Sequence, residues 1–510
     1  VIFSEQNNKI ALVCGVTKNL TDILKYTSFI ILGILLSEWL ANNQKNSKIE
    51  SILKIIEKNY VDSIDINSLY DNSINDIMLN LDPHSSYINS EKFNTIKEDM
   101  QGSFSGIGVQ FSIINDTIVV VAPIAGGPSE KLGILSGDRI VYVEKELVAS
   151  INIKNEDVIK KLRGLKGSTV NIDIYRKGNN KLINYNIVRD DIPLKSVDAS
   201  IMLDNNIGYI KLNRFAATTY EEFSFGVEKL LKNGMEKLIL DLRNNPGGYL
   251  GVAINICDDF LKDNQLIVYT QGNKRAKDEI YSTKNGDLIN TELVVLIDEG
   301  SASASEIVAG AIQDNDRGTV IGRRSFGKGL VQEQIKLNDN SVIRITTQRY
   351  YTPSGRCIQK PYKKNDFIEE VFDSTIYKTK FGRKVYASGG IYPDILVELD
   401  SSLNFSKLNE LLSLGLINEF CLNESIKIRE EDIKKTTFLN LDENTFFSNF
   451  ISFLDEKYKS NYVNNLGVKE KQYLNILLIS KIAQNVWGDE IYYLIQSKND
   501  EFIKKAIHNN

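Results

Sequence analysis

Histidine is almost missing from this chain of 510 residues, which contains two, His84 and His508. His508 lies close to the end of the sequence, where chains commonly fray. A Ser–His–Asp or Cys–His catalytic site would therefore have to use His84, which lies in the turn-like stretch DPHSS and which we interpret as structural. Because imidazole is the commonest transition-metal ligand, we expect no multi-histidine metal site.

Cysteine is also scarce, with four residues, Cys14, Cys257, Cys357 and Cys421. No two of them have C-x-x-C spacing, which argues against zinc and thioredoxin-like sites. Strong positive charge is missing too, because the formal net charge is -5 and no dense stripe of Lys and Arg occurs. We therefore expect no nucleic-acid partner and no cofactor.

Long apolar runs are limited to one near the N-terminus, Tyr26–Ser37 (12 residues, 37 − 26 + 1), which follows two lysines. It is short for a membrane span but has the length of a signal-peptide apolar region. We interpret residues 1–45 as an uncleaved signal anchor, with membrane anchorage through residues 26–40; the alternative is a buried core helix. This segment predicts an extracytoplasmic location, on the periplasmic side of an inner membrane.

The remaining chain changes character several times, and its length suggests three or four domains. Residues 46–100 have helical periodicity, including a helix at about 74–81. Residues 101–192 combine glycines, short β-rich runs and two short helices, which predicts a compact independent unit. Residues 193–400 alternate strands and helices, as an α/β core does. Residues 401–510 are helical again and contain no chemical motif.

A candidate nucleophile follows a buried strand predicted at Leu293–Ile297. The strand runs into small residues and then a helix, and Ser303 and Glu306 have the S-x-x-E spacing of a capping box, which places Ser303 at the helix N-terminus. Amides at that end stabilise developing negative charge. The alternative is that Ser303 is only an N-cap, because capping boxes are common.

A candidate base is Lys328, which lies between Gly327 and Gly329. A lysine that acts as general base must be neutral, so burial has to lower its pKa from about 10.4 toward about 7–8. Lysine is a natural base for a serine nucleophile in a chain with almost no histidine. The alternative is a phosphate-binding loop, but a glycine follows the lysine where that motif has Ser or Thr.

A third element is the segment 241–248, DLRNNPGG, in which two glycines follow a buried strand. Such glycines can present backbone N–H groups to an oxyanion. An ordinary turn would have the same composition, so this segment alone decides nothing.

Together these residues resemble the C-terminal processing peptidases, also called tail-specific proteases. The matching segments span about 80 to 396: LDPHSSYI (81–88), DLRNNPGG (241–248), GSASASEIVAGAIQD (300–314), GRRSFGKGLVQ (322–332), RYYTPSGRCIQ (349–359) and GGIYPDI (389–395). The resemblance implies a multidomain α/β fold: a crotonase/ClpP-like protease core at 193–400, an inserted PDZ domain at 101–192, and helical regions at 46–100 and 401–510.

The resemblance also implies roles for individual residues. Ser303 is the nucleophile, Lys328 is the base, and Gln332 orients that lysine. The backbone amides of Gly248 and Ala304 form the oxyanion hole. Serine stands at position 325 where the family usually has threonine, and we expect Asp314 to support the framework of the site.

The unit at 101–192 resembles a PDZ domain, which implies capture of protein C-termini. Its carboxylate-binding loop is Gly106, Ile107, Gly108 and Val109. A PDZ groove adds a peptide as an extra strand and holds the terminal carboxylate on backbone N–H groups. Arg163 matches a position where the family places an arginine linking the PDZ state to the active site; the alternative is a solvated surface arginine.

The resulting prediction is a serine endopeptidase that recognises protein C-termini and cleaves with a Ser–Lys pair. Two alternatives come from other classes: a catalytically inactive PDZ scaffold that binds peptides, and a crotonase-like acyl-transfer enzyme. Contacts between copies of the chain, through the helical region 401–510, are a further expectation.

Overall fold

The computed structural model describes residues 48–362, 375–399, 405–441, 444–458 and 466–509, without 205, 284, 285 and 388, and also residues 27, 28, 31–33 and 37. Most of the predicted anchor, 26–40, is outside the described residues. No helix in the described part of the chain is both long enough and apolar enough to cross a bilayer.

The chain divides into two compact units, of which the first ends at Leu81. Within the first unit, α2 (Lys48–Asn59) and α3 (Ile66–Leu79) are the described helices beyond residue 47. The sequence predicted a helix from about 74, but α3 begins earlier because the Asp65 side chain accepts hydrogen bonds from the N–H groups of Asn67 and Ser68.

The second unit contains the predicted PDZ region. This region has a sheet with the strand order β3-β4-β5-β7-β8, and β6 pairs with β5. Its apolar core includes Ile118, Ile140 and Ile172. β3 is an edge strand of this sheet, so one of its sides has no strand partner among the described residues. The elements are β3 (Val109–Ile113), β4 (Ile118–Pro123), α5 (Pro128–Lys131), β5 (Arg139–Val143), β6 (Glu146–Leu147), α6 (Asn155–Leu162), β7 (Thr169–Tyr175) and β8 (Ile183–Val188).

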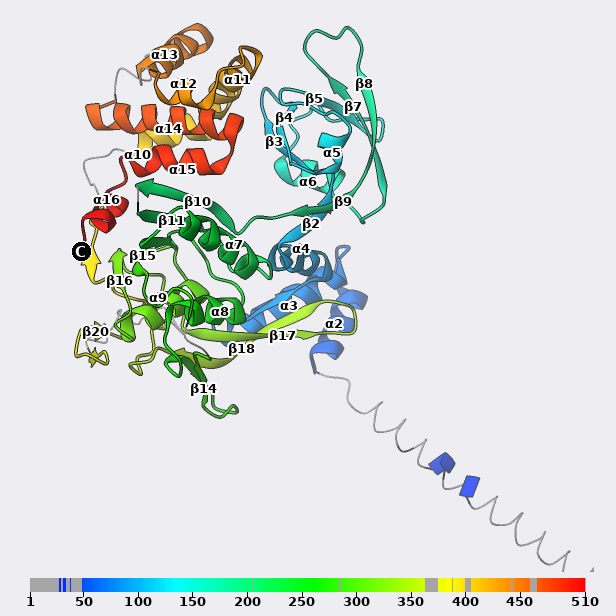
Figure 1. Cartoon of the computed structure of the whole chain (residues 1–510). Coiled ribbons are helices and arrows are strands. Elements are labelled where there is room, and N and C mark those ends of the chain that lie inside the picture. The colour runs from blue at the N-terminus through cyan, green and yellow to red at the C-terminus, as the bar shows by residue number, and fades with distance from the viewer. Residues whose placement is uncertain are drawn as a thin grey trace, which may run out of the picture. The chain divides into compact units, whose positions relative to one another are not determined.

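The chain enters and leaves this region through one pair of strands. β2 (Ser103–Gly106) pairs antiparallel with β9 (Asp190–Pro193), with Ser103 opposite Pro193. The helix α4 (Ser90–Gln101) precedes β2 and ends at Gly102, which has φ 78°. The region is therefore an insertion whose two ends lie side by side (Figure 1).

The centre of the second unit is a six-stranded sheet in the order β10-β11-β12-β15-β16-β21. β10 and β11 are antiparallel, and every pair from β11 to β21 is parallel. The strands are β10 (Val197–Asp204), β11 (Ile207–Leu212), β12 (Lys237–Asp241), β15 (Glu292–Ile297), β16 (Thr319–Gly322) and β21 (Ile395–Leu396). The inner strands are nearly continuous apolar runs because helices cover both faces.

Alternate residues of these strands belong to two different apolar clusters. One face packs on α7 (Thr219–Lys232), α8 (Leu250–Phe260) and α9 (Ala304–Asp314), with Leu240 and Val295 in the cluster. The other face, with Ile239 and Val294, packs on α15 (Asp489–Ser497) and α16 (Glu501–His508). Figure 1 shows these two C-terminal helices in red, beside β10, β11 and β16. The end of the chain is thus part of the central layer structure.

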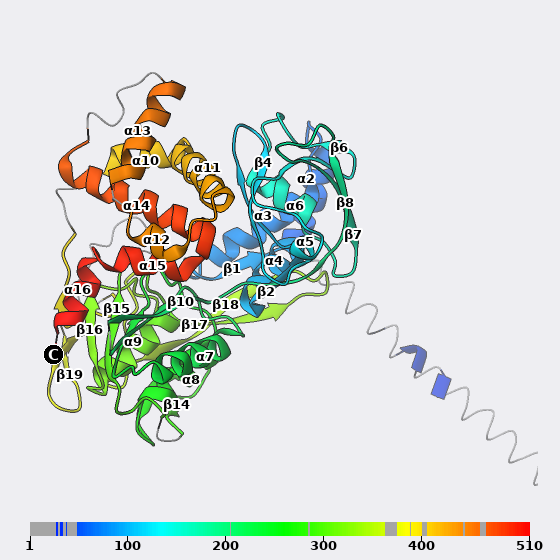
Figure 2. The same cartoon turned by 45° about the horizontal axis from the view of Figure 1, so that its top comes forward.

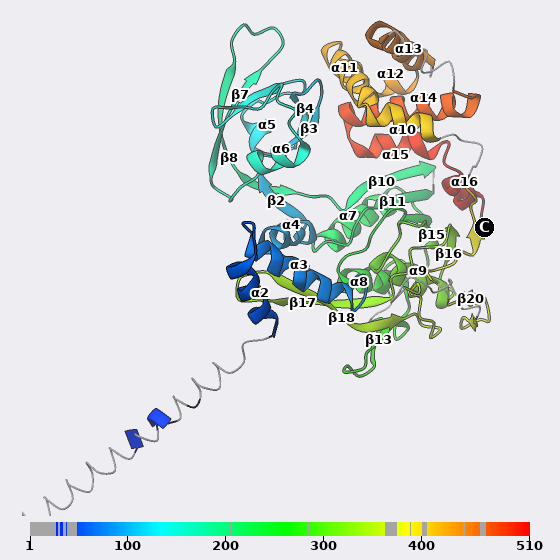
Figure 3. The same cartoon turned by 180° about the vertical axis from the view of Figure 1, so that it is seen from behind.

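A second sheet has the order β1-β18-β13-β14, with β17 paired to β18. The long strands β17 and β18 run side by side in Figure 3. A separate hairpin joins β19 (Ile376–Lys378) and β20 (Lys384–Tyr386). The bounds are β1 (Ser86–Ile88), β13 (Leu266–Gln271), β14 (Asp278–Tyr281), β17 (Leu330–Lys336) and β18 (Val342–Tyr351).

The C-terminal helices α10 to α14 have an apolar core of their own, which includes Phe420, Phe450 and Leu478. They are α10 (Phe405–Ser413), α11 (Leu416–Glu430), α12 (Lys435–Leu439), α13 (Asn444–Tyr458) and α14 (Val468–Trp487). Leu422 of α11 is buried with Val119 and Val121 of β4. In Figure 2, α11 accordingly faces β4.

Candidate active site

The predicted nucleophile lies at a strained turn between β15 and α9. Ser303 is the N-cap of α9, as predicted, and has φ 55° and ψ -110°. Positive φ is uncommon for a residue with a side chain, and strain of this kind is often found at functional sites. The Ser303 side chain makes no capping hydrogen bond, so its hydroxyl is not committed to the helix end.

The three serines of the segment SASAS differ in their contacts. The Ser301 hydroxyl is buried and donates to the Leu242 carbonyl at 2.8 Å. The Ser305 hydroxyl is buried and donates to the Asn245 carbonyl at 2.9 Å. Both side chains therefore hold the turn to the segment 242–245, and Ser303 is the one of the three that is only half-buried.

Glu306 joins the serine turn to the lysine loop. Its Oε2 accepts the N–H of Ser303 at 2.8 Å and that of Lys328 at 2.9 Å. Its Oε1 accepts the Ser325 hydroxyl at 2.6 Å and the Gly327 N–H at 2.7 Å. Burial raises the pKa of this fully buried carboxyl, while the four hydrogen bonds oppose the rise. The sequence identified Glu306 only as a capping-box partner; the S-x-x-E spacing was the available signal.

Lys328 and Gln332 are in contact, as the family pattern implies. The Lys328 Nζ lies 2.9 Å from the Gln332 Oε1, and the Gln332 amide donates to the His84 carbonyl. Burial lowers the pKa of Lys328, and the positive charge of Arg344 lowers it further. The same surroundings lower the pKa of His84, through burial first and the Lys328 charge second. No motif in the sequence indicated this role of Arg344, which lies in β18, 16 positions beyond Lys328 (344 − 328).

The glycine turn at 247–248 lies directly against the serine turn. Gly247 has φ 95°, and a Cβ there would come within 2.6 Å of the Ala302 oxygen and 2.9 Å of the Ser303 Cβ. Gly248 has φ 151°, and a Cβ there would come within 2.1 Å of the Phe215 oxygen. Both positions therefore require glycine, and the amide nitrogen of Ala304 would be 2.9 Å from the same Gly247 Cβ.

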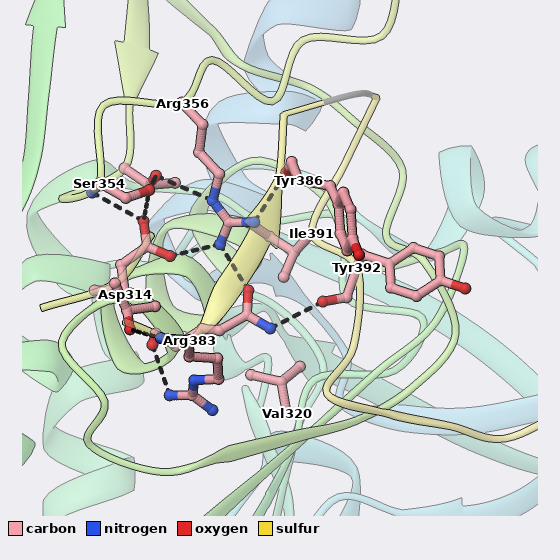
Figure 4. Close-up of polar contacts among 12 residues, drawn as sticks. Asp314, Val320, Ser354, Arg356, Arg383, Tyr386, Ile391 and Tyr392 are labelled. Atoms are coloured by element: carbon pink, nitrogen blue, oxygen red, sulfur yellow. Dashed lines mark hydrogen bonds and ion pairs between the residues drawn. The ribbon is translucent and has the colours of Figure 1, made fainter. Parts of the chain in front are cut away.

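Asp314, at the end of α9, is part of a buried polar cluster (Figure 4). Its Oδ1 lies 2.6 Å from Arg356 Nη2, and both side chains are fully buried. Its Oδ2 accepts the N–H and hydroxyl of Ser354 at 3.0 and 2.6 Å. Arg356 also donates to Gln313 at 2.6 Å and to the Tyr386 carbonyl at 2.9 Å. This cluster fixes the chain that follows Arg356.

The segment after Arg356 in turn holds the lysine loop. Gly329 N–H donates to the Gln359 side chain at 2.8 Å, and Lys360 N–H donates to the Gly327 carbonyl at 2.8 Å. A Cβ on Gly329 would come within 2.9 Å of the Gln359 nitrogen. The polar contacts of Asp314 are thus with Ser354 and Arg356, in the segment that leads to Gln359 and Lys360.

The predicted carboxylate-binding loop leads into the edge strand of the inserted region. Gly106 ends β2, Ile107 is buried in the core, and Gly108 has φ 74°, which turns the chain into β3 at Val109. A Cβ on Gly108 would come within 2.9 Å of the Ile192 side chain. The loop therefore has the position that strand addition at β3 would require.

Arg163 follows α6 and contacts the segment that leads into this region. Its guanidinium carbon lies 4.0 Å from the centroid of the Phe104 ring, and its Nη1 lies 3.2 Å from Glu98 Oε2 on α4. Burial raises the pKa of Glu98, and the Arg163 charge opposes that rise. Arg163 is therefore paired, and the two partners Glu98 and Phe104 belong to α4 and β2.

Two family models match the chain: a PDZ domain over residues 105–187 and peptidase family S41 over residues 206–368. A carboxy-terminal-processing protease of Bartonella bacilliformis is 36% identical over 355 residues, covering 66% of this chain and 81% of that protein. The carboxy-terminal processing protease CtpB of Bacillus subtilis is 34% identical over 319 residues, covering 61% of this chain and 65% of that protein.

Among solved structures, a photosystem II D1 C-terminal processing protease is similar at 25% identity and a TM-score of 0.37, covering 68% of this chain and 91% of that chain. The assignment of the chain to a family, given next, depends on the sequence matches alone.

Together, the fold and these matches define a serine-type peptidase with an inserted PDZ domain. The chain belongs to peptidase family S41 and, within it, to the carboxy-terminal-processing proteases. The predicted fold class, an α/β protease core with an inserted PDZ domain and flanking helical regions, is confirmed. Within the described residues, no group of three or more His, Cys, Asp or Glu side chains could hold a metal ion.

Proposed function

We propose that this peptidase cleaves with Ser303 as nucleophile and Lys328 as base. The observation that supports the pairing is the Glu306 carboxylate, whose Oε2 accepts the backbone N–H of both residues. One buried oxygen thereby holds the serine turn and the lysine loop next to each other. The crotonase-like alternative lacks such support, because acyl transfer has no use for a half-buried lysine beside a serine or for a PDZ domain.

The mechanism begins with a neutral Lys328, whose lowered pKa makes the free amine accessible. The amine takes the proton from the Ser303 hydroxyl as the oxygen attacks the substrate carbonyl carbon. The C–N bond then breaks, and the lysine returns the proton to the leaving amine. Water attacks the acyl-enzyme in the second half-reaction, with the same amine as base. Gln332 orients the lysine through the 2.9 Å hydrogen bond.

The oxyanion of the tetrahedral intermediate would be bound by the N–H groups of Gly248 and Ala304. The close approach of Gly247 to Ala302, Ser303 and the Ala304 nitrogen supports this assignment. Ala304 is the first residue of α9, so its N–H is one of those that a helix leaves without an intrahelical partner. Developing negative charge at this position also meets the positive end of the helix dipole.

The test compares Ser303→Ala and Lys328→Ala with Ser301→Ala in the full chain, using an unstructured substrate with an apolar C-terminal tail. We expect both of the first two variants to lose cleavage by at least about 1000-fold while keeping the wild-type melting temperature. Ser301→Ala retains the nucleophile but removes the hydrogen bond to the Leu242 carbonyl, so we expect it to keep measurable cleavage while losing some stability. Wild-type activity in Ser303→Ala would reject the assignment, and no cleavage by the unaltered chain would favour the inactive scaffold.

Substrate capture is assigned to the PDZ domain, with Gly106, Ile107, Gly108 and Val109 as the loop that binds the terminal carboxylate. A chain end adds as a strand along β3 and presents its carboxylate to backbone N–H groups of this loop. Amidation of the substrate C-terminus removes the charge and should raise KM about tenfold with kcat unchanged. Equal KM for the acid and the amide would reject this mode of capture.

Arg163 would couple the PDZ domain to the protease. Its contacts with Glu98 and Phe104 support the proposal, because they bridge the PDZ helix end to α4 and β2. Arg163→Ala should change the stimulation of cleavage by a separate C-terminal peptide, while the basal rate stays the same. A surface arginine without this role would leave the stimulation unchanged.

The chain is proposed to act outside the cytoplasm, on the periplasmic side, held by the N-terminal segment at 26–40. The apolar run of that segment supports the proposal. Fractionation that finds the full-length protein free in the cytosol would reject it.

Association of copies through the helices at 401–510 is a further proposal, which sedimentation of the full chain tests directly.

A further inference from the structure

The first turn of α16 lies against two arginines from separate loops of the protease. The Asp500 side chain caps the helix, accepting the N–H of Phe502 at 2.8 Å and of Ile503 at 3.4 Å. Its other oxygen, Oδ2, lies 2.7 Å from Arg243 Nη1. The centroid of the Phe502 ring lies 4.6 Å from the guanidinium carbon of Arg243 and 5.0 Å from that of Arg323.

The two arginines belong to the two loops that the proposed mechanism uses. Arg243 precedes the proposed oxyanion residue Gly248 by five positions (248 − 243), and Arg323 precedes the proposed base Lys328 by five positions (328 − 323). Each arginine also has a local partner, since Arg243 pairs with Asp241 and Arg323 pairs with Glu299 at 2.7 Å. The Phe502 ring is a contact that these two arginines have in common.

The charges explain why an aromatic ring suits this position. Two guanidinium groups close to one another repel, and the negative face of an aromatic ring attracts both. Asp500 adds one carboxylate next to Arg243, which offsets more of the repulsion. An aliphatic side chain of the same size would fill the space and leave the two cations without this attraction.

The helix that carries Phe502 is firmly attached to the sheet. Ile503 and Ala506 are buried in the cluster with Tyr209 and Ile321. The Lys505 amine donates to the Leu396 carbonyl at 2.9 Å. A Cβ on Gly322, one residue before Arg323, would come within 3.1 Å of the Phe502 ring, so the ring also touches the backbone of that loop.

We propose that Asp500 and Phe502 are positioning residues for the peptidase reaction. Through Arg243 and Arg323, they hold the oxyanion loop and the base loop in the arrangement that cleavage requires. Neither residue touches the substrate. The inference rests on the proposed Ser303–Lys328 function, and it makes the C-terminal helix part of the catalytic domain.

The experiment measures kcat, KM and melting temperature for four variants of the full chain. Phe502→Leu keeps an apolar side chain without a π face, and Phe502→Trp keeps the π face. Asp500→Asn removes the charge and keeps a capping side chain. Lys504→Ala is the matched control on the same helix, because the Lys504 side chain is 42% exposed and pairs with Glu501. Any cleavage that remains in Ser303→Ala is subtracted from the measured rates as background.

We expect kcat to fall about three- to tenfold in Phe502→Leu and in Asp500→Asn, with KM within twofold of the wild type. Phe502→Trp should restore kcat, and Lys504→Ala should leave it unchanged. Wild-type kcat in Phe502→Leu, or equal losses in the leucine and tryptophan variants, would overturn the inference and leave the proposed function standing. Full cleavage in Ser303→Ala would instead reject the proposed function, so the two failures are distinguishable.

Discussion

Asp314 and Arg356 form an ion pair with 2.6 Å between Oδ1 and Nη2, and both side chains are fully buried. Figure 4 shows the guanidinium surrounded by its acceptors. Removal of one partner from a buried pair leaves an uncompensated charge, which costs about 3–5 kcal/mol. We therefore expect Arg356→Met to lower the midpoint of urea unfolding strongly. Arg275→Met, which breaks the exposed pair with Glu333, is the control, and equal midpoints for the two variants would contradict the expectation.

Glu306→Gln should lower kcat by at least about tenfold. Each carboxylate oxygen accepts two hydrogen bonds, so an amide nitrogen at either position would face two donors. A buried donor or acceptor left unsatisfied costs about 1–3 kcal/mol. Steady-state kinetics at saturating substrate measures the effect, and the exposed Glu333→Gln is the matched control. An unchanged kcat would mean that Glu306 does not hold the serine turn and the lysine loop together.

The dependence of activity on pH should reflect the lowered pKa of Lys328. The neutral amine is the reactive form, so activity rises as pH increases through that pKa, with a midpoint below the ordinary 10.5. Burial is the main cause and the Arg344 charge is the second. Arg344→Gln should therefore move the midpoint to higher pH, and a midpoint that moves down or stays fixed would exclude Arg344 as a cause.

The same shift predicts a dependence of stability on pH. The pKa of Lys328 is lower in the folded state than in the unfolded state, so between the two values the unfolded state binds more protons. The free energy of unfolding should then rise with pH across that window, up to about pH 10.5. Lys328→Met has no group to titrate and should lack this part of the slope. Urea unfolding at several pH values measures this dependence. An equal rise of the free energy of unfolding with pH in the wild type and in Lys328→Met would refute the lowered pKa of Lys328.

Gly247→Ala should lower kcat by about 100-fold, because its Cβ would come within 2.9 Å of the Ser303 Cβ and 2.6 Å of the Ala302 oxygen. The φ of 95° adds strain for any residue with a side chain. Gly251→Ala, in α8, has no atom within 4 Å of the added Cβ and should be neutral or slightly stabilising. Equal kcat for the two variants would show that the glycine turn does not support the serine turn.

Thiol reagents should leave activity unchanged. Burial raises the pKa of Cys257, that of the half-buried Cys357, and that of Cys421 to about 12, so little thiolate forms at neutral pH. All three are free cysteines. Inactivation by iodoacetamide in native buffer, reported by residual cleavage, would point to a cysteine near the site.

Local patterns were sufficient for much of the fold. The buried strand predicted at Leu293–Ile297 coincides with β15 (Glu292–Ile297) apart from its first residue. The predicted start of a helix at Ser303 is confirmed, since cap spacing is a local signal. The predicted start of α3, at about residue 74, is too late. The apolar periodicity of this helix is weak, and its true start at Ile66 is marked by the Asp65 cap.

Contacts between distant segments were not predictable in the same way. Three of the four hydrogen bonds of Glu306 depend on the packing of the lysine loop against α9, about 20 residues further along the chain. Phe502 contacts Arg243 across 259 positions (502 − 243), and the sequence of 401–510 offered no chemical motif to suggest it. One chain without an alignment contains no signal for such pairs.

The pairing of β2 with β9 means that the chain enters and leaves the PDZ domain through one two-stranded ribbon. Any swing of the domain must bend this ribbon, and the Arg163–Glu98 pair lies next to it. A tilt of the PDZ domain about this ribbon would therefore strain the Arg163–Glu98 pair, and it would also separate Leu422 of α11 from Val119 and Val121 of β4.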